Sequence, residues 1–410
     1  MDIALIRKSY TPYGGGEVFL SRFTKELVRK GHICHIFANK WDDGKSEVRG
    51  LPPNVSIGGQ RSEVGNQNPN IIFHQVKTFG PSFLRILSFA VNSYFAVKKA
   101  QLDVIVSFDR TLYQDICRAG DGCHREWLIH REKAWGMGHG AWVRRTIRKV
   151  ITCLNPLHFT LLYLEKKLFN SKKLKFVIAN SNRGKEEIIR HYKLPEEKIC
   201  VIYNGIDIKK FDLKGKDESR RAFRKRFNIS DGAIILLFVG SGFERKGLGF
   251  LIKAFGLLKV NGYDNIKLLV VGKGNIKKYF NLALESGIEK DIIFTGPLKS
   301  VIDCYYAGDV FCLPSIYEPF SNACLEAMAA GLPVVTSRIN GASEILADKE
   351  DGMIIEDPAN PEEIAEKIIP LLDIDKRNKM GVQARKKAED YTIEKNVEGF
   401  LKLINMTGVK

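Results

Sequence analysis

The chain has 410 residues, which is too long for one ordinary hydrophobic core and enough for two domains. Its apolar content of 44% and aromatic content of 10% are typical of a soluble globular protein. The net charge of +17 would suit nucleic acid, an anionic membrane face or a phosphorylated substrate, although part of it could be solvated lysine with no partner. The sequence contains no recognisable nucleic-acid-binding module, so we rank a membrane and a phosphorylated substrate above DNA or RNA.

No segment of the sequence is typical of export or of membrane insertion. The first strand-like run ends at Arg7 and Lys8, so it is not the apolar region of a signal peptide, and no apolar run approaches the roughly 20 residues that cross a bilayer. We therefore expect a cytoplasmic protein. The eight cysteines form no CxxC pair, and we interpret them as buried reduced thiols rather than a metal cluster or a disulfide framework.

Strand-like and helix-like patterns alternate along the chain, which predicts parallel sheets flanked by helices. In the first half, a helix is expected from about Val18 to Lys30, and strands are expected at residues 2–6, 33–38, 103–107 and 175–180. In the second half, strands are expected at residues 233–240, 267–272, 291–295, 309–313 and 333–336. Two such series predict an α/β protein with two Rossmann-like domains that face one cleft, with ligands at the carboxyl ends of the strands.

The first strand runs into a glycine-rich turn, Gly14-Gly15-Gly16, directly before the first helix. Glycines at a helix start gather backbone N–H groups that suit a phosphate. The turn lacks the GxGxxG spacing of dinucleotide-binding proteins and the lysine of a Walker motif. The next residue, Glu17, could contact an acceptor hydroxyl or could simply interact with the helix dipole.

Polar residues also gather after strand 103–107. Asp109 follows this strand directly, and Asp121 and His124 lie in a loop, residues 118–127, that is rich in charged side chains. Their density suggests a site for an acceptor or a sugar. A single histidine is more often structural, and that interpretation of His124 stays open.

Residues 141–175 combine many lysines and arginines with apolar side chains, and Asn155-Pro156 divides the segment into two amphipathic pieces. Basic amphipathic helices commonly lie on anionic membranes. The alternative is a helix that packs on its own domain and leaves a basic face in solvent.

In the second half, strand 233–240 runs into the loop Gly240–Gly247, whose glycines allow a ligand to come close. Arg245 and Lys246 emerge there at the carboxyl end of a strand, where fixed cations could stabilise charge on a phosphate. The alternative is an exposed loop with ordinary charges. Two further turns, Val271–Gly274 and Gly296–Leu298, follow strands at the same edge.

The most informative stretch is Glu318–Glu326. Its two carboxylates lie eight positions apart, one in a loop and one on the helix that follows. Ser321-Asn322-Ala323 occupies the expected helix start, so several free backbone N–H groups should form an anion site. A phosphate cradle with a carboxylate on either side matches the ribose, diphosphate and sugar of a nucleotide sugar. An ordinary capped helix with two solvated glutamates is the alternative.

Two segments that follow, Pro333–Thr336 as a buried strand and Gly341–Ile345 as a short helix, extend this pattern. Together with Glu318–Glu326 they resemble the retaining glycosyltransferases of family 4, which have GT-B architecture, and in particular the lipopolysaccharide-core glucosyltransferases. The resemblance covers nearly the whole chain. It implies an acceptor-side domain at residues 1–205, a nucleotide-sugar-binding domain at 206–385 and a helix at 386–410 that crosses back to the first domain.

The resemblance also implies roles for residues that match the family's motifs. Arg245 and Lys246 would grip the diphosphate, Glu318 would meet the donor sugar, and Glu326 would meet the ribose. The catalytic set, with two candidates from the first domain, is Arg245, Lys246, Glu318, Asp109 and His124. The donor-binding set is Gly15, Gly16, Gly242, Leu298, Phe320, Ser321, Asn322 and Glu326. No metal ion or cofactor is expected, because relatives of this type use protein cations and helix termini instead.

We therefore expect a retaining, metal-independent hexosyltransferase that moves glucose from UDP-glucose to a lipopolysaccharide-core or other membrane-associated glycan. Uridine is favoured over guanine or adenine by analogy alone. The partners would be a nucleotide diphosphate sugar, a glycan or glycolipid acceptor and the anionic inner face of the cell membrane, and not nucleic acid. Two alternatives stay open: a GT-B nucleotide-sugar epimerase, and a non-catalytic, membrane-bound protein that binds nucleotide sugars.

Overall fold

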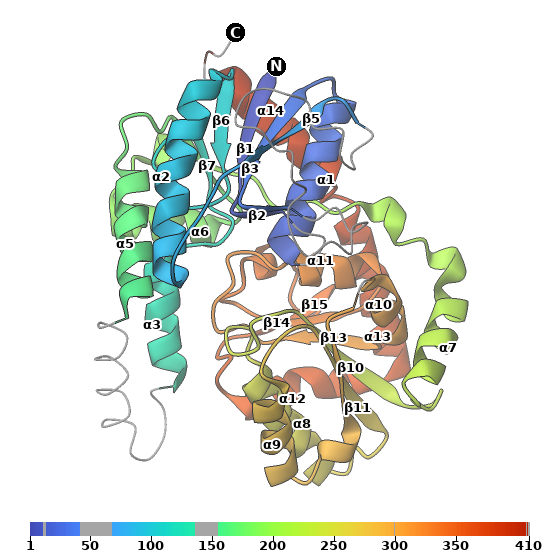
Figure 1. The fold of residues 1–410 in the computed structure, drawn as a ribbon. Helices are drawn as coiled ribbons and strands as arrows, with labels where there is room; N and C mark the ends of the chain where they lie inside the picture. The colour runs from blue at the N-terminus through green and yellow to red at the C-terminus, as the bar shows by residue number, and fades with distance from the viewer. Residues whose placement is uncertain (11–13, 42–67, 136–154, 299, 407, 409–410) are drawn as a thin grey trace. The chain divides into compact units, whose positions relative to one another are not determined.

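The computed structural model describes residues 1–410 except 11–13, 42–67, 136–154, 299, 407 and 409–410. The chain divides into two compact units, each with its own parallel sheet (Figure 1). So far as these residues are described, the first unit comprises Met1–Ile129, Gly138–Tyr203 and Ile393–Lys410, and the second comprises His130–Met137 and Asn204–Thr392. Two parallel α/β halves confirm the fold class predicted from the sequence.

The first unit contains a seven-stranded sheet in the order β5-β3-β1-β6-β7-β8-β9. In chain order its strands are β1 (Asp2–Ile6), β3 (Ile33–Ala38), β5 (Ile71–Gln75), β6 (Val104–Ser107), β7 (Ile116–Arg118), β8 (Phe176–Ala179) and β9 (Ile199–Val201). The four predicted strands begin and end within one residue of their expected bounds. Strands β5, β7 and β9 were not predicted, because β7 and β9 have three residues each and β5 carries polar His74 and Gln75. A second, two-stranded sheet pairs β2 (Ser9–Tyr10) with β4 (Lys40–Trp41).

Six helices that the structure describes belong to this unit in whole or in part. They are α1 (Gly15–Arg29), α2 (Ser82–Ala100), α3 (His124–Trp135), α5 (Pro156–Phe169), α6 (Asn182–Tyr192) and α14 (Ile393–Met406). Helix α1 begins three residues before the expected Val18, and its first backbone hydrogen bond joins the Val18 N–H to the Gly14 carbonyl at 3.0 Å. The prediction missed this start because glycine has a low helix propensity.

The last helix, α14, packs into the core of the first unit. Phe400 is 2% exposed, and its ring meets Phe23 of α1 edge to face with centroids 4.9 Å apart. The buried residues of α14 that join this core are Ile393, Val397, Phe400, Leu403 and Ile404. They recur at helical spacing, which is the pattern of an amphipathic helix with one buried face.

The second unit contains a six-stranded sheet in the order β12-β11-β10-β13-β14-β15. Its strands are β10 (Ile234–Val239), β11 (Ile266–Val271), β12 (Ile292–Gly296), β13 (Val310–Leu313), β14 (Val334–Ser337) and β15 (Gly352–Ile355). The first five lie within one residue of the prediction, and only β15 was missed. Its helices include α7 (Lys216–Arg226), α8 (Leu248–Val260), α9 (Ile276–Glu285), α10 (Ile302–Ala307), α11 (Asn322–Ala329), the 3₁₀ helix η5 (Gly341–Ile345), α12 (Pro361–Ile368) and α13 (Ile374–Ala388).

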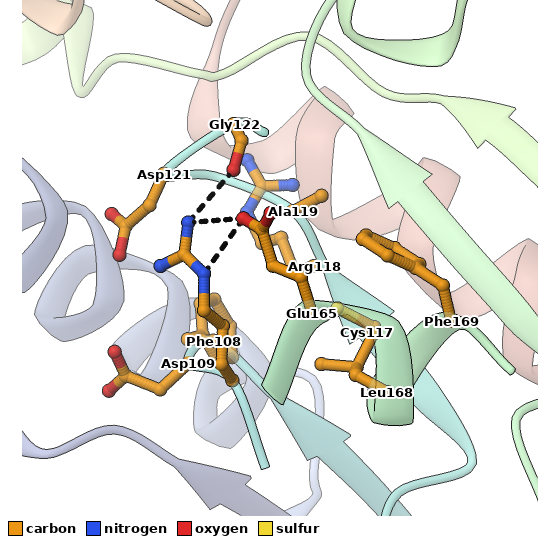
Figure 2. Close-up of a pocket in the computed structure, with 11 residues that line it drawn as sticks. Phe108, Asp109, Cys117, Arg118, Ala119, Asp121, Gly122, Glu165, Leu168 and Phe169 are labelled. Carbon is orange, nitrogen blue, oxygen red and sulfur yellow. Dashed lines mark hydrogen bonds and ion pairs between the residues drawn. The ribbon is translucent and has the colours of Figure 1, made fainter. Parts of the chain in front are cut away.

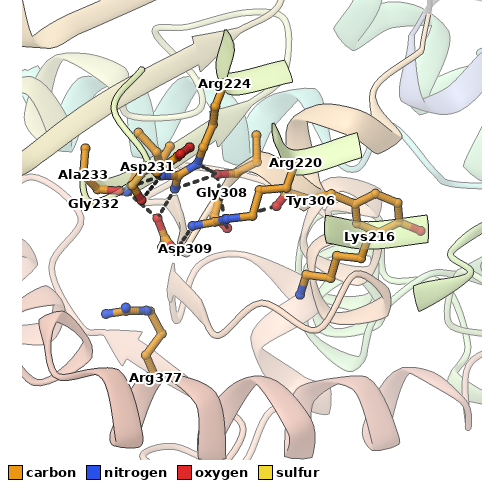
Figure 3. A network of polar contacts seen from close by, with 12 residues as sticks. Lys216, Arg220, Arg224, Asp231, Gly232, Ala233, Tyr306, Gly308, Asp309 and Arg377 are labelled. Atoms are coloured by element: carbon orange, nitrogen blue, oxygen red, sulfur yellow. Dashed lines mark hydrogen bonds and ion pairs between the residues drawn. The ribbon is translucent and has the colours of Figure 1, made fainter. Parts of the chain in front are cut away.

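A buried arginine connects α7 to the amino-terminal edge of this sheet through an ion pair (Figure 3). Arg224 is 1% exposed and forms a 2.7 Å ion pair with Asp309, which also accepts a hydrogen bond from Arg220 at 2.7 Å. The same carboxylate accepts the backbone N–H of Ile235 at the start of β10 at 2.7 Å. Arg224 also donates to the carbonyls of Ala233 and Ala307, at 3.0 and 3.1–3.2 Å, so its buried guanidinium is paired and hydrogen-bonded.

The amphipathic segment at 141–175 is described only from Asn155 onward, and residues 141–154 lie outside the described residues. Asn155 accepts a hydrogen bond from the Leu157 N–H at 2.9 Å, and Pro156 is the first residue of α5. Phe159 and Tyr163 on this helix are 70% and 46% exposed. None of the helices among the described residues is both long enough and apolar enough to cross a membrane.

The seven cysteines that the structure describes are all free thiols, and six of them are buried. Burial raises the pKa of Cys324, in α11, to about 11, so this thiol is protonated at neutral pH. For these seven residues the prediction of buried reduced thiols is confirmed, except that Cys200 is only partly buried.

Replacing Phe400 with alanine should destabilise the first unit by about 3–5 kcal/mol, because the substitution removes a buried ring from the contact with α1. All four tryptophans lie before residue 143 in the chain, so urea unfolding followed by tryptophan fluorescence reports mainly on the first half. Met406→Ala is the control on the same helix, since Met406 is 71% exposed. Equal midpoints for the two variants would contradict the packing described for α14.

Candidate functional site

Three charged side chains meet at the carboxyl edge of the second sheet. Arg245 and Lys246 lie in the loop between β10 and α8, and Glu318 lies in the loop between β13 and α11. Lys246 Nζ is 2.7 Å from one oxygen of Glu318, and Arg245 Nη1 is 2.9 Å from the other. Glu318 and Lys246 are 7% and 8% exposed. The structure therefore brings together three of the five residues expected to be catalytic.

The charge on Glu318 is set by these two neighbours. Burial by itself would raise the pKa of Glu318, but the charges and hydrogen bonds of Arg245 and Lys246 outweigh burial, so the pKa lies below its ordinary value. Glu318 is therefore ionised at neutral pH. Two cations and one carboxylate leave the trio with one net positive charge, which suits an anionic ligand.

Close packing of the two loops fixes the trio. At Gly240 the φ angle is +151°, and a Cβ there would lie 2.6 Å from Lys246 Cδ, so glycine leaves room for the lysine stem. At Gly247 the φ angle is +75°, and a Cβ would lie 1.9 Å from the Pro314 carbonyl oxygen. The Ile316 N–H donates to the Arg245 carbonyl at 2.9 Å. These contacts hold the loops after β10 and β13 against each other.

Two of the expected donor-binding residues lie on a row of turns at the same edge. The Gly242 N–H donates to the Lys273 carbonyl at 3.3 Å, and the Gly272 N–H donates to the Gly296 carbonyl at 3.0 Å. Leu298, two residues beyond Gly296, is partly buried. The turns after β10, β11 and β12 are thus joined backbone to backbone, so Gly242 and Leu298 belong to one continuous surface.

The start of α11 differs from the expectation in one respect. Ser321 caps the helix, and its hydroxyl accepts the Cys324 N–H at 3.4 Å, while its own N–H donates to Asn340 at 3.1 Å. The prediction of several free N–H groups was therefore wrong for these two, because short polar side chains fold back onto them. Phe320, which precedes the cap, is 4% exposed, and Asn322 accepts a hydrogen bond from Asn204 at 2.6 Å.

Glu326 accepts a hydrogen bond from a tyrosine that the sequence motifs did not indicate. The Tyr305 hydroxyl, on α10, donates to Glu326 at 3.0 Å, and the tyrosine is 0% exposed. Burial, reinforced by the charge of Glu326, raises the pKa of Tyr305, so its hydroxyl remains a donor at neutral pH. The carboxylate of Glu326 therefore has a fixed partner within the protein.

In the first unit, an arginine organises the residues at the carboxyl edge of the sheet. Arg7 follows β1, and its guanidinium lies 3.2 Å from Asp121, 3.7 Å from Asp109 and 3.9 Å from Glu17. It also donates to the Phe108 carbonyl at 2.8 Å. From the sequence, Arg7 was interpreted only as the end of a strand. A signal was available, because polar residues at the carboxyl end of a parallel strand often line a site.

The glycine-rich turn lies next to Arg7. Gly15 and Gly16 are exposed and form the first turn of α1, and a Cβ on Gly16 would lie 2.9 Å from Arg7 Nη2. Burial raises the pKa of Glu17, an effect that Arg7 opposes. Asp109 accepts the Lys8 N–H at 2.6 Å. Asp109 and the glycine turn are therefore connected through Arg7.

His124 points into a different cluster. Its ring nitrogen lies 2.9 Å from His158 of α5, and its backbone N–H donates to Glu165 at 2.7 Å. The residue is 8% exposed at the start of α3. This packing suits the structural interpretation of His124 that the sequence left open.

A small, partly open cavity lies between these two clusters (Figure 2). Its polar lining residues include Asp109, Arg110, Arg118, Asp121 and Glu165. Arg110 donates to the Glu165 carboxylate at 2.9 Å and to the Gly122 carbonyl at 3.1 Å. Burial lowers the pKa of Arg118 to about 9.

Within the part of the chain that the structure describes, no group of three or more histidine, cysteine or acidic side chains could hold a metal ion. At the carboxyl edge of the second sheet, Arg245 and Lys246 supply fixed positive charge.

Comparison with known proteins gives a family for both halves of the chain. The model described as Glycosyltransferase Family 4 matches residues 13–210, and the model described as Glycosyl transferases group 1 matches residues 219–387. The second match includes Arg245, Lys246, Glu318 and Glu326. The first includes Gly15, Gly16, Asp109 and His124.

Curated relatives match over different lengths. The uncharacterized glycosyltransferase MJ1607 of Methanocaldococcus jannaschii is 36% identical over 192 residues, 46% of this chain and 48% of that protein. The lipopolysaccharide glucosyltransferase WaaG of Escherichia coli K12 is 24% identical over 366 residues, 89% of this chain and 88% of WaaG. The chain thus spans about half the length of the first relative and most of the second.

Solved structures share the fold across both units. The crystal structure of WaaG matches with a TM-score of 0.78 at 21% identity, covering 98% of this chain and 99% of WaaG. HepE of Anabaena in complex with UDP-glucose matches with a TM-score of 0.70 at 17% identity, covering 98% of this chain and 99% of HepE. With both family models matched and the GT-B fold shared, the chain belongs to the family-4 glycosyltransferases of GT-B architecture and is similar to WaaG.

Proposed function

We propose that the chain is a retaining hexosyltransferase that binds a nucleoside diphosphate sugar at the carboxyl edge of the second sheet. The observation that carries the proposal is the trio of Arg245, Lys246 and the buried Glu318, with its one net positive charge. In the proposed reaction, negative charge builds on the leaving phosphate as the bond to the anomeric carbon breaks. Cations already in place stabilise that state more than the ground state, so they would supply the charge that a metal ion supplies elsewhere.

The donor would lie along the row of residues that follows the sheet edge. Glu326 would bind the ribose, the cap at Ser321 and Asn322 would meet the diphosphate, and the turns at Val271–Gly274 and Gly296–Leu298 would border the base. The loop that contains Gly242 would pass close to the donor. We propose UDP-glucose as the donor, supported by the name of WaaG as a glucosyltransferase and by the UDP-glucose bound to HepE.

The first unit would take the acceptor. We propose residues 1–205 as the acceptor-side domain, 206–385 as the donor-side domain, and 386–410 as the returning helix. Gly15 and Gly16 would touch the donor phosphates, and Asp109, held by Arg7 and the Lys8 N–H, is the proposed acidic group of this domain. A lipopolysaccharide-core or other membrane-associated glycan is the proposed acceptor.

Uridine nucleotides should raise the thermal midpoint of the protein in a panel of UDP, GDP, ADP, UDP-glucose, UDP-N-acetylglucosamine and GDP-mannose. A ligand at about 100 times its dissociation constant adds about 2.7 kcal/mol of stability. Glu326→Ala should abolish the shift, whereas Glu366→Ala, an exposed position on α12, should keep it. A panel with no response would contradict the donor site and favour the non-catalytic alternative. Donor turnover without any acceptor would favour the epimerase.

Arg245→Ala should lower kcat by about 10²–10³, because one fixed cation is lost from the leaving phosphate. The measurement is sugar transfer at saturating donor and acceptor, with and without EDTA, which should leave the wild-type rate unchanged. Arg221→Ala is the matched control, since Arg221 is exposed on α7. An unchanged rate in Arg245→Ala would remove this residue from the catalytic set.

We also propose that the first unit binds the anionic inner face of the cell membrane through the segment that contains α5. Phe159 and Tyr163 lie one helical turn apart, are 70% and 46% exposed, and are followed by exposed Lys166 and Lys167. Exposed aromatic side chains next to lysines suit the boundary between anionic headgroups and acyl chains.

Phe159→Ser should reduce the fraction of protein that sediments with vesicles of phosphatidylglycerol and phosphatidylcholine, because it removes apolar area from the proposed contact. Phe280→Ser, on α9 of the second unit, is the control, since Phe280 is also exposed, at 42%. Binding to vesicles of phosphatidylcholine alone should be weaker for all three proteins. Equal sedimentation of both variants and the wild type would count against α5 as part of the contact.

A further inference from the structure

Asn340 is a buried residue that neither the sequence motifs nor the proposed chemistry has used. It lies between β14 and η5 and is 0% exposed. Its side-chain oxygen accepts the N–H groups of Ser321 and Ala342, both at 3.1 Å. Its side-chain nitrogen donates to the Thr336 hydroxyl at 2.9 Å and to Cys324 Sγ at 3.3 Å. One amide thus connects β14, the start of η5 and the start of α11.

The chemistry of the partners fixes the orientation of this amide. The two backbone N–H groups can only donate, so the oxygen of Asn340 must face them. The Thr336 hydroxyl gives its one hydrogen to the Leu313 carbonyl at 2.8 Å, so it must accept from the nitrogen of Asn340. An asparagine side chain can accept two hydrogen bonds and donate two, and here all four are made. Aspartate has the same shape but would turn a carboxylate oxygen toward Thr336, where a donor is required.

The main chain next to Asn340 holds the segment Glu318–Ser321 at its other end, at Glu318. The N–H of the next residue, Gly341, donates to the Glu318 carbonyl at 2.9 Å, and residues 318 and 340 form a parallel bridge. The turn from Glu318 to Ser321 is therefore held at both ends by one short segment. At the first end is the carboxylate that binds Arg245 and Lys246, and at the second is the start of α11.

We propose that Asn340 is a positioning residue for the diphosphate of the donor, which rests on the proposed function of this site. It keeps the helix start of α11 and the trio of Arg245, Lys246 and Glu318 in one fixed arrangement. Asn340 acts through these groups and does not touch the ligand. Loss of its amide lets the two ends of the turn move apart, so binding of the phosphates weakens while binding of the nucleoside does not.

Asn360 provides a matched control within the same unit. It caps α12, and its side-chain oxygen likewise accepts two backbone N–H groups, those of Glu362 at 3.1 Å and Glu363 at 3.2 Å. Asn360→Ala therefore removes a cap of the same chemistry from a helix that carries none of the proposed donor-binding residues. A purely structural role for Asn340 predicts the same behaviour for both variants.

The test compares dissociation constants for UDP and for uridine, measured by calorimetry on the full chain at a temperature where every variant is folded. Asn340→Ala should weaken UDP binding by about tenfold or more, as expected when hydrogen bonding to a charged group is disturbed, and change uridine binding less than about twofold. Asn360→Ala should change neither constant. If Asn340→Ala does not fold, Thr336→Val, which removes one partner of the amide, should show the same selective weakening of UDP at smaller size.

Other outcomes overturn the proposal in distinguishable ways. Equal weakening of UDP and uridine by Asn340→Ala, or no change in either, would show that Asn340 does not position the diphosphate. Wild-type protein that binds neither UDP nor another nucleoside diphosphate would overturn the proposed donor site and this inference with it.

Discussion

One buried carboxylate holds two cations at the end of the second sheet, and the proposed chemistry depends on that ion pairing. Glu318 accepts from both Lys246 and Arg245, at 2.7 and 2.9 Å. Removing one member of a buried ion pair typically costs about 3–5 kcal/mol, and Glu318 and Lys246 form such a pair, whereas the Arg245 side chain is 34% exposed. The cations are already oriented before any ligand arrives, and little reorganisation is needed when charge develops on a phosphate.

Sheet topology explains how residues so distant in sequence can form this trio. Strands β10 and β13 are neighbours in the parallel sheet, although residues 246 and 318 are separated by two other strands in the chain. Both loops leave the same edge because all strands run in one direction. Gly247 packs against the Pro314 carbonyl, and Asn340 accepts a hydrogen bond from the Ser321 N–H. These contacts fix the distances between the loops.

Periodicity was enough to predict nine strands, since parallel strands buried on both faces appear as apolar runs. The motifs after those strands placed Arg245, Lys246 and Glu318 at one edge, and the structure brings them into contact. The strands that escaped prediction are short or polar, as β5 and β7 are. Helix α1 was predicted to start late because its glycines have poor helix propensity.

What could not be predicted depends on tertiary contacts. Arg7, Tyr305 and Asn340 belong to no motif, and their roles appear only when Asp109, Glu326 and Ser321 are seen next to them. The same holds for His124, whose partner His158 is on another helix. The N–H groups at the start of α11 were expected to be free because a sequence does not show which side chains fold back onto them.

The packing of α14 has a consequence for the order in which the chain folds during synthesis. The second sheet is made from one unbroken stretch, β10 to β15, so every strand it needs has been synthesised by residue 355. The core of the first unit contains Phe400 and Ile404, which follow the whole of the second sheet in the chain. The unit whose first strands are synthesised earliest is therefore completed after the second sheet, and its apolar surface around Phe23 stays exposed until α14 has been made.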